Sequence, residues 1–329
     1  MIAIFGAGAI GCWVGGKLAA GGAPITLIGR PRVLDELAGG LEISELSAEH
    51  PTRTTPALAT TAAAAAAAEI VLVTVKSAQT AEAGAALARV LPDRGVVVSL
   101  QNGVRNAEIL RTALPGRIVL AAMVPFNVVR REPGAYHRAS AGALRIDDDR
   151  AAAPLLVACR AAALPIEPRS DMPAVQWAKL VMNLNNAINA LSGIPLAREL
   201  AQRAFRRCLA AAQREALELL AIANHDVAKL TAIPPRWMPR LLEVPDPVFR
   251  LLARRVVAID PHARSSMWDD LEAGRPTEID YLQGEVVALA ERLGRDAPIN
   301  RALVGLVRKA EAGGRRDFSA EELVALLAL

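Results

Sequence analysis

Cysteine is scarce in this chain, and its positions exclude two kinds of site. The 329 residues contain three cysteines, at positions 12, 159 and 208. An odd number of widely spaced cysteines forms neither a disulfide framework nor a paired C-x-x-C metal site. We therefore expect no bound metal and a reducing compartment.

A strong charge bias and a long apolar run are also missing. The formal net charge is only +4, and no dense Lys/Arg stripe with interleaved aromatics is present, which argues against a nucleic-acid partner. Threonines and Glu69 interrupt the most lipid-like stretch, residues 57–75. We predict a surface helix ending near Glu69 and then a buried strand at 70–75, and not a membrane span. With no basic signal region at its start, the chain is expected to be cytoplasmic.

Aromatic residues make up only 3% of the chain, whereas hydrophobic residues make up 53%, much of it alanine. The core is therefore expected to consist of closely packed aliphatic side chains. A chain of this length fits one large or two ordinary domains.

A glycine-rich turn directly follows the first apolar segment. Residues 1–5 and 24–29 read as strands, and residues 11–22 read as a helix between them. A G-x-G-x-x-G motif at the first turn of such a unit is typical of dinucleotide binding. Gly6 would allow the tight turn, Gly8 the approach of a pyrophosphate, and Gly11 close helix packing. The alternative is a helix cap in another α/β protein. The candidate cofactor-binding residues are Gly6, Ala7, Gly8, Ala9, Ile10 and Gly11.

The end of the second strand indicates which cofactor binds. NAD-binding domains usually carry an acidic residue there, which hydrogen-bonds to the ribose 2′-hydroxyl. This chain instead has Arg30, with Arg32 close behind. Arginine can hold a 2′-phosphate by paired, charge-assisted hydrogen bonds, so NADP(H) is favoured over NAD(H). Arg30 is the first candidate, and Arg32 is either the second or a solvated loop charge.

Two further strand ends carry polar residues. Lys76 follows the strand predicted at 70–75, and Asn102 follows the strand predicted at 96–100. Ligands of open parallel sheets lie outside the carboxyl ends of the strands, so both residues are candidates for contact with nicotinamide and substrate. Asn102-Gly103 could also be an ordinary tight turn. Further strands, at about 118–129, 143–147 and 163–168, complete a doubly wound parallel sheet in an α/β domain over residues 1–168.

The second half, residues 169–329, is predicted to be an all-α domain. A helix over 172–193 places Lys179, Asn183 and Asn186 at i, i+4 and i+7, on one face. Asparagine is a poor helix former and is unfavourable when buried without a partner, so this stripe suggests a polar ligand. The alternative is an exposed polar stripe. Residues 230–250 are rich in proline and fit a loop with short helical turns, which could be an oligomer contact or a flap.

A last block, residues 265–281, combines two serines with an acid. A helix over 265–272 is followed by the breakers Gly274 and Pro276. Thr277 is then expected to cap another helix, with Asp280 at its third position. Capping chemistry alone can explain Ser266 and Glu278.

The chain resembles the ketopantoate reductase family, the NADP-dependent 2-dehydropantoate 2-reductases. The resemblance rests on five blocks in order, which are GAGAIG, TVKSAQ, LQNGV, WAKLVMN and SSMWDDLEAGRPTEIDY. It implies a Rossmann domain followed by a helical substrate domain. It also implies reduction of 2-dehydropantoate to pantoate by NADPH, a step of pantothenate biosynthesis. Another 2-keto acid substrate, or a non-catalytic NADP-binding sensor, are the alternatives.

The resemblance also implies roles for individual residues. Lys179 matches the family's catalytic lysine, Glu278 the glutamate of the TEIDY block, and Ser266 a substrate-binding serine. Lys76 and Asn102 match active-site positions, and Asn183 the first asparagine after the lysine. The family spacing would place a second asparagine where this chain has Ala187, so Asn186 or Asn189 replaces it, and helical phase favours Asn186. The sequence leaves the oligomeric state open, with a homodimer as the candidate.

Overall fold

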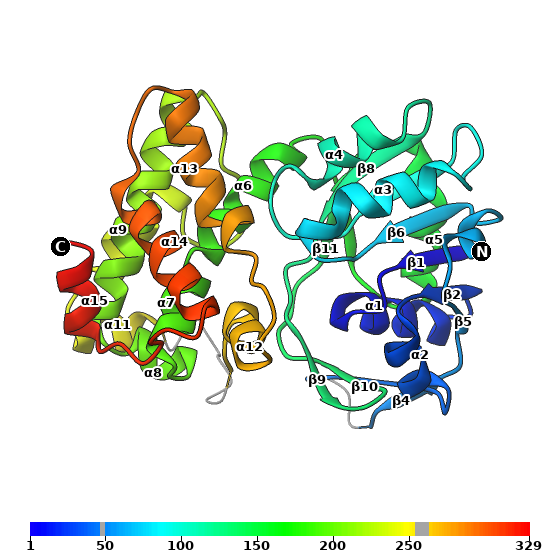
Figure 1. The fold of residues 1–329 in the computed structure, drawn as a ribbon, viewed down its shortest axis with the longest axis horizontal. Coiled ribbons are helices and arrows are strands. Elements are labelled where there is room, and N and C mark those ends of the chain that lie inside the picture. The colour runs from blue at the N-terminus through cyan, green and yellow to red at the C-terminus, as the bar shows by residue number, and fades with distance from the viewer. Residues whose placement is uncertain (47–49, 254–262) are drawn as a thin grey trace. The chain divides into compact units, whose positions relative to one another are not determined.

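The computed structural model describes residues 1–46, 50–253 and 263–329. The chain divides into two compact units, Met1–Met172 and Pro173–Leu329. The first unit is an α/β structure and the second is helical, which confirms the predicted fold class (Figure 1).

An eight-stranded sheet forms the centre of the first unit, with the strand order β12-β11-β8-β7-β6-β1-β2-β5. Neighbouring strands are parallel except β8 and β11, which are antiparallel. Central strands such as β6 and β7 are almost continuous apolar runs because helices cover both faces of a parallel sheet. The strands are β1 Ile2–Phe5, β2 Ile25–Ile28, β5 Ala57–Ala59, β6 Ile70–Val73, β7 Val96–Ser99, β8 Ile118–Met123, β11 Leu144–Asp147 and β12 Ile166–Arg169.

The strand order reverses next to β1, and this reversal determines where a ligand can bind. From β1 the chain passes through α1 to β2 on one side, whereas β6 pairs with the other side of β1. Such a switch point opens a crevice at the carboxyl ends of the strands. The helices of this unit are α1 Ala9–Ala20, α2 Pro31–Leu37, α3 Thr80–Ala88, α4 Asn106–Ala113 and α5 Ala153–Ala161, with the short 3-10 turns η1 Ala62–Ala65, η2 Ser77–Gln79 and η3 Arg150–Ala152.

A second, four-stranded sheet was not predicted. Its strands are ordered β4-β3-β10-β9 and comprise β3 Leu41–Glu45, β4 Thr52–Thr54, β9 Val128–Glu132 and β10 Ala135–Arg138. The stretch expected as one strand at 118–129 divides at Pro125, which cannot donate to a strand ladder. The predicted surface helix ending near Glu69 is also wrong. That stretch forms β5 and the single turn η1, because Ala57–Ala59 pairs with β2.

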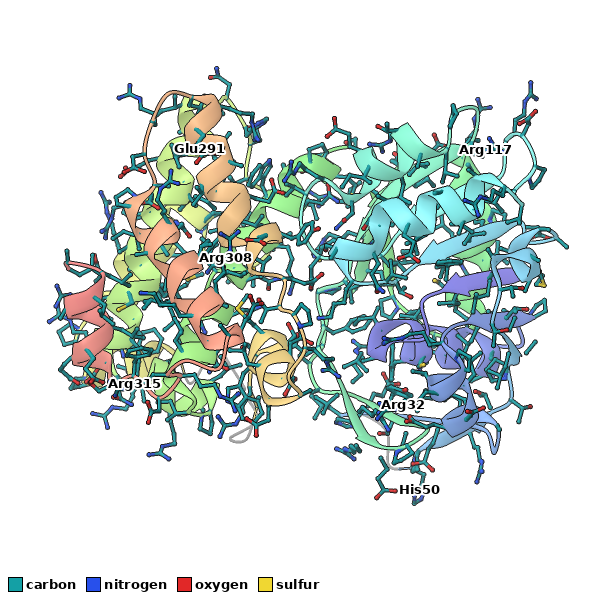
Figure 2. The ribbon with its side chains drawn as sticks, viewed as in Figure 1. Arg32, His50, Arg117, Glu291, Arg308 and Arg315 are labelled. Atoms are coloured by element: carbon teal, nitrogen blue, oxygen red, sulfur yellow. The ribbon has the colours of Figure 1, made fainter. Side chains whose placement is uncertain are left out.

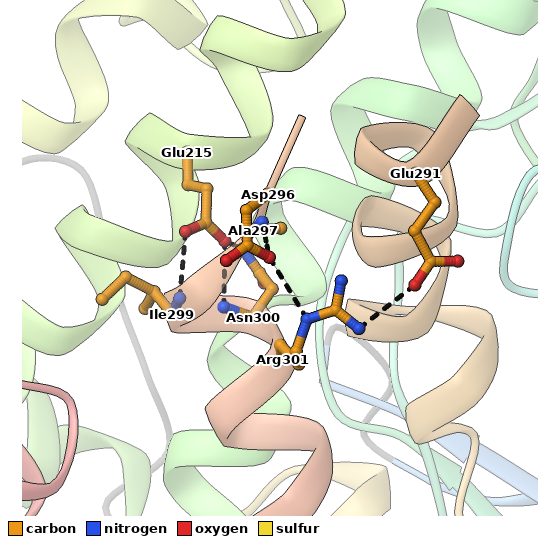
Figure 3. Close-up of polar contacts among 7 residues, drawn as sticks. All are labelled: Glu215, Glu291, Asp296, Ala297, Ile299, Asn300 and Arg301. Atoms are coloured by element: carbon orange, nitrogen blue, oxygen red, sulfur yellow. Dashed lines mark hydrogen bonds and ion pairs between the residues drawn. The ribbon is translucent and has the colours of Figure 1, made fainter. Parts of the chain in front are cut away.

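The second unit is built around three long helices, α9, α13 and α14, which pack against one another (Figure 1). Glu215 on α9 closes the amino-terminal end of α14: its carboxylate accepts hydrogen bonds from the backbone N–H of Ile299 and of Asn300, each at 2.9 Å (Figure 3). The helices are α6 Met172–Asn183, α7 Asn185–Ser192, α8 Leu196–Leu200, α9 Arg203–Ile222, α10 Met238–Leu242, α11 Asp246–Ala253, α12 Ser266–Glu272, α13 Gln283–Arg292, α14 Pro298–Glu311 and α15 Ala320–Leu326, with 3-10 turns η4 Pro235–Trp237 and η5 Ile279–Tyr281.

The single helix expected over 172–193 is divided at Leu184 into α6 and α7. Two buried side-chain amides donate hydrogen bonds to backbone carbonyl oxygens at this junction. Gln283 Nε2 donates to Leu184 O at 2.8 Å, and Gln213 Nε2 donates to Val181 O at 3.2 Å. Side-chain donors of this kind can replace helix hydrogen bonds where a helix is interrupted. α7 then ends at Gly193 in the left-handed conformation, with φ +66°.

The proline-rich segment 230–250 is anchored to α9 by Arg206. This guanidinium is fully buried, and it donates to Leu242 O at 2.9 Å and to Val244 O at 2.8 Å. It also pairs with Asp246 at 2.9 Å. The fourth partner of Arg206 is Leu200 O, at 2.8 Å. The segment forms η4, α10 and the start of α11, in agreement with the short helical turns expected there.

Candidate active site

The protein's own packing requires glycine at two positions of the first turn, Gly6 and Gly11, but not at Gly8. Gly6 has φ +122°, and a Cβ there would lie 2.7 Å from Val75 N. A Cβ at Gly11 would lie 2.1 Å from the carbonyl oxygen of Gly6. Any side chain at either position would therefore collide with backbone. Thr74, just past β6, holds the same turn by donating its hydroxyl to Gly6 O at 2.6 Å.

Gly8 is different, because no atom lies within 4 Å of the position that its Cβ would take. It is exposed and occupies the N-cap of α1, where it offers no side-chain acceptor. The start of α1 therefore has open space beside its N-cap and no side-chain cap on its first N–H groups. A helix start of this kind suits an anionic phosphate, so the residues present fit a dinucleotide.

Arg30 lies two residues beyond the end of β2 and is exposed. It is the N-cap of α2, and Pro31 at the first helical position fixes the start of that helix. Gly29, just before it, packs against the glycine turn: a Cβ there would lie 2.6 Å from the Cβ of Ala7. The backbone of Arg30 is therefore held next to the turn. Arg32 is exposed as well (Figure 2).

Lys76 and Asn102 follow neighbouring parallel strands and lie at the same edge of the sheet. Lys76 comes three residues after β6 and is exposed, whereas Asn102 comes three residues after β7 and is half-buried. The two loops are joined directly, since Ser77 Oγ donates to Asn102 O at 3.2 Å. Gly103 has φ +87°, so the tight turn considered for Asn102-Gly103 is also present.

In the second unit, Lys179 and Asn183 share one face of α6 at i and i+4, and both are half-buried. Burial lowers the pKa of Lys179 to about 8. Met182, one turn from Lys179, is 42% exposed. The polar face of α6 therefore includes one exposed thioether.

The break at Leu184 separates Asn183 from Asn186, which begins the polar part of α7. Asn186 is half-buried, and its carbonyl oxygen accepts from Ser265 Oγ at 3.2 Å. Ser265 is the buried N-cap of α12, where its hydroxyl accepts from the backbone N–H of Trp268. Ser266, the first residue of α12, is exposed. Asn186 and Ser266 are thus brought together through Ser265.

Asn189 has a different part in the fold. It is fully buried, and its amide donates to Glu199 Oε2 at 2.6 Å and to Ile194 O at 3.0 Å. Its Oδ1 accepts from the backbone N–H of Ser265 at 2.8 Å. Because both ends of the amide are occupied inside the protein, Asn186 is the better candidate for a ligand contact.

Glu278 is 8% exposed and directly precedes η5. The predicted cap at Thr277 is wrong in form. Thr277 Oγ1 accepts from Ile279 N at 3.2 Å, which closes one 3-10 turn, and α13 begins only at Gln283. Asp280, expected at the third position of a capped helix, instead pairs with Arg308 at 2.7 Å.

Sequence reasoning missed residues that support the site rather than face a ligand. These are Thr74, Thr80 and Asn106. One signal was present for two of them, since Thr80 lies four residues after Lys76 and Asn106 four residues after Asn102. A polar residue four positions after a polar strand-end residue indicates the start of the next helix, next to the same loop.

Two general features bear on the kind of site. Among the residues that the structure describes, no group of three or more His, Cys, Asp or Glu side chains is placed to hold a metal ion. Likewise, no helix in the described ranges combines the length and the apolar character needed to cross a membrane.

Comparison with known proteins gives a consistent result. The family model "Ketopantoate reductase PanE/ApbA" matches residues 2–150, and its C-terminal counterpart matches residues 171–311. The 2-dehydropantoate 2-reductase of Halobacterium salinarum is 30% identical over 325 residues, which cover 95% of this chain and 99% of that protein. A PanE/ApbA family ketopantoate reductase from Ralstonia eutropha JMP134 is 30% identical, with a TM-score of 0.81 over 95% of this chain and 98% of that one.

D-mandelate dehydrogenase, in a ternary structure with NADH and anilino(oxo)acetate, has a TM-score of 0.79 at 17% identity, over 95% of this chain and 98% of that one. That likeness shows a shared fold. The two family matches together span most of the chain and confirm the resemblance seen in the five sequence blocks. The chain therefore belongs to the ketopantoate reductase family, a family of oxidoreductases.

Proposed function

We propose that this protein reduces 2-dehydropantoate to pantoate with NADPH, a step of pantothenate biosynthesis. The observation that carries the proposal is Lys179, a half-buried ammonium with a lowered pKa on the polar face of α6. A reductase of a 2-keto acid needs such a cation, because the ketone oxygen gains negative charge as the carbon is reduced. The family of the chain and its glycine turn support the same reaction.

The first unit would hold the cofactor. Residues Gly6 to Gly11 and the start of α1 fit the pyrophosphate, because Gly8 leaves open space there. Arg30 would bind the 2′-phosphate by charge-assisted hydrogen bonds, which favours NADPH over NADH. Lys76 and Asn102, at the carboxyl ends of β6 and β7, would lie at the nicotinamide end. When bound, the reduced nicotinamide supplies the hydride.

The second unit would supply the acid and hold the substrate. Lys179 would stabilise the developing charge on the ketone oxygen and donate its proton from Nζ. A pKa of about 8 lets the ammonium persist at neutral pH and still release its proton readily. Glu278 would hold this ammonium or bind a substrate hydroxyl. Asn183, Asn186 and Asn102 would orient the substrate, and Ser266 would bind its carboxylate.

The test is oxidation of NADPH, followed by absorbance, with 2-dehydropantoate and a panel of other 2-keto acids. We expect the highest kcat/KM with 2-dehydropantoate. Lys179→Ala should remove most of the turnover while the protein still binds NADPH. Near-normal kcat in that variant would contradict the role given to Lys179. The oligomeric state stays a prediction, and sedimentation of the full chain is the measurement for it.

A second candidate is the reduction of another 2-keto acid by the same residues. Ala187 departs from the expected asparagine, and Met182 adds an exposed apolar side chain to the polar face. A methionine adapts to apolar groups of different shapes. Preference for a bulky apolar 2-keto acid in the panel would favour this candidate. Tight NADPH binding without turnover of any member would instead favour a sensor.

A further inference from the structure

A buried polar network joins the two strand-end loops of the first unit. We propose that Thr80 and Asn106, which begin α3 and α4, are positioning residues that fix the loops of Lys76 and Asn102 for catalysis. Neither residue needs to touch cofactor or substrate. The inference rests on the proposed function, because the loops that these residues position carry Lys76 and Asn102, which would contact cofactor and substrate in the proposed reaction.

Thr80 is fully buried and connects three segments. Its hydroxyl oxygen accepts from Gln101 Nε2 at 2.7 Å. The same oxygen lies 2.8 Å from Asn106 Oδ1 and 2.8 Å from the carbonyl oxygen of Ser77. One threonine hydroxyl therefore links the loop after β6, the loop after β7 and the start of α4.

Asn106 is 1% exposed and continues the network to the candidate residue itself. Its Nδ2 donates to the carbonyl oxygen of Asn102 at 2.5 Å and to Ser77 Oγ at 3.1 Å. Ser77 Oγ donates in turn to the same carbonyl oxygen at 3.2 Å. Two donors thus hold the peptide oxygen of Asn102, which fixes the backbone from which its side chain extends.

The direction of donation is consistent along the network. Ser99 Oγ donates to Gln101 Oε1 at 3.0 Å, and Gln101 Nε2 donates to Thr80. The Thr80 hydroxyl can then donate to Asn106 Oδ1, and Asn106 Nδ2 donates to Asn102 O. Chains of buried hydrogen bonds strengthen one another, and removal of one member leaves the others unsatisfied. Loss of the Thr80 hydroxyl should therefore weaken the hydrogen bonds that hold the backbone of Asn102.

The spacing explains why these residues suit the task. Thr80 follows Lys76 by four residues, and Asn106 follows Asn102 by four. Each residue is therefore the first of the helix that directly follows its strand-end loop. Each candidate residue is thus followed by its own anchor, and the anchors contact each other. Errors of about 1 Å in the position of a reacting group can reduce turnover by about 100-fold.

The experiment compares Thr80→Val with Thr80→Ser in the full chain. Valine keeps the shape but removes the hydroxyl, whereas serine keeps the hydroxyl. Thr26→Val is the matched control, because Thr26 is also buried and lies on β2 outside the network. Asn106→Asp, which replaces the donor to Asn102 by an acceptor, tests the second anchor.

We expect Thr80→Val and Asn106→Asp to lower kcat by about 10- to 100-fold, with little change in the Kd of NADPH. Thr80→Ser should restore most of the activity, and Thr26→Val should leave it near wild type. Amide hydrogen exchange should accelerate in residues 101–106 of the Thr80→Val and Asn106→Asp proteins, and should stay near wild type in the Thr80→Ser and Thr26→Val proteins. Equal kcat in Thr80→Val and Thr26→Val would overturn the proposal, as would unchanged exchange. If the wild-type protein reduced no 2-keto acid, the proposed function would fail, and exchange would still decide whether the network holds the loop.

Discussion

Lys179 is the residue at which burial matters most for the proposed reaction. An exposed lysine has a pKa near 10.4 and gives up its proton slowly at neutral pH. Burial within α6 disfavours the charged form and brings the pKa to about 8. The ammonium is then both charged enough to attract an anionic oxygen and acidic enough to protonate it.

This pKa predicts a pH profile for reduction. In the proposed mechanism the protonated form of Lys179 is the active one, so kcat should fall above pH 8, by about tenfold per pH unit once the lysine is mostly neutral. Lys179→Arg keeps a positive charge that does not titrate in this range, so its lower activity should lack that descending limb. A wild-type profile that stays flat to about pH 9.5 would contradict the assignment, and initial rates with saturating NADPH are the measurement.

Arg30 makes a separate prediction about cofactor choice. Hydrogen bonds to a charged group contribute about 1.5–3 kcal/mol, so Arg30→Ala should raise the Kd of NADPH by about 10- to 100-fold. The Kd of NADH, which lacks the 2′-phosphate, should change little. Arg89→Ala is the matched control, since Arg89 is also exposed and lies at the carboxyl end of α3. Equal losses for both cofactors in a fluorescence titration would remove Arg30 from the phosphate site.

At the scale of elements, the sequence predicts those parts whose cause is local. The unit β1-α1-β2 was predicted because two apolar strands are separated by glycines that backbone contacts require. The strands β3, β4, β9 and β10 were not predicted. β4 and most of β9 are exposed and polar, and β3 pairs with β10, which lies far along the chain. No local periodicity encodes such a pairing.

The candidate site follows the same division. The glycine turn, Arg30, the strand-end residues and the polar face of α6 could all be read from position in the chain. From the sequence, only the helical phase favoured Asn186 over Asn189 as a ligand contact. The burial of Asn189 against Glu199 supports the same choice. The roles of Thr80 and Asn106 could not be predicted from the sequence, because their hydrogen-bond partners come from other segments.

Glu215 gives a prediction about a helix start. Its carboxylate accepts two backbone hydrogen bonds at the positive end of α14, an arrangement similar to a helix cap (Figure 3). Glu215→Ala should therefore lower the free energy of unfolding by about 1–2 kcal/mol. Glu218→Ala, an exposed position one turn along the same helix, should change it far less. Urea denaturation of both variants is the measurement, and equal losses would argue against the cap.

At the scale of the whole molecule, the two compact units differ in how their buried polar groups are satisfied. In the first unit, uncharged side chains join two loops at the edge of the sheet. In the second, buried ionisable groups lie between helices, among them Arg206 and Glu199. The stability of the second unit should therefore depend more strongly on pH.

Glu199 makes this dependence measurable. It is fully buried on α8, and burial raises the pKa of its carboxyl to about 8, although hydrogen bonds from Asn189 and Asn185 oppose the shift. Between about pH 5 and 8 the folded chain keeps a proton that the unfolded chain has lost. Stability from this group is therefore complete below the unfolded pKa near 4.3 and is lost as pH rises through 8.

Glu199→Gln should remove that slope, because glutamine resembles the protonated acid and does not titrate. We expect wild type and variant to have similar unfolding free energies at pH 5, and the variant to be the more stable one at pH 8. Lys179 stays protonated in both states over most of this window, so it adds little to the difference. Urea denaturation at several pH values is the measurement. Parallel pH dependence in the two proteins would mean that Glu199 is already ionised in the fold, with its charge balanced by groups other than the two asparagines.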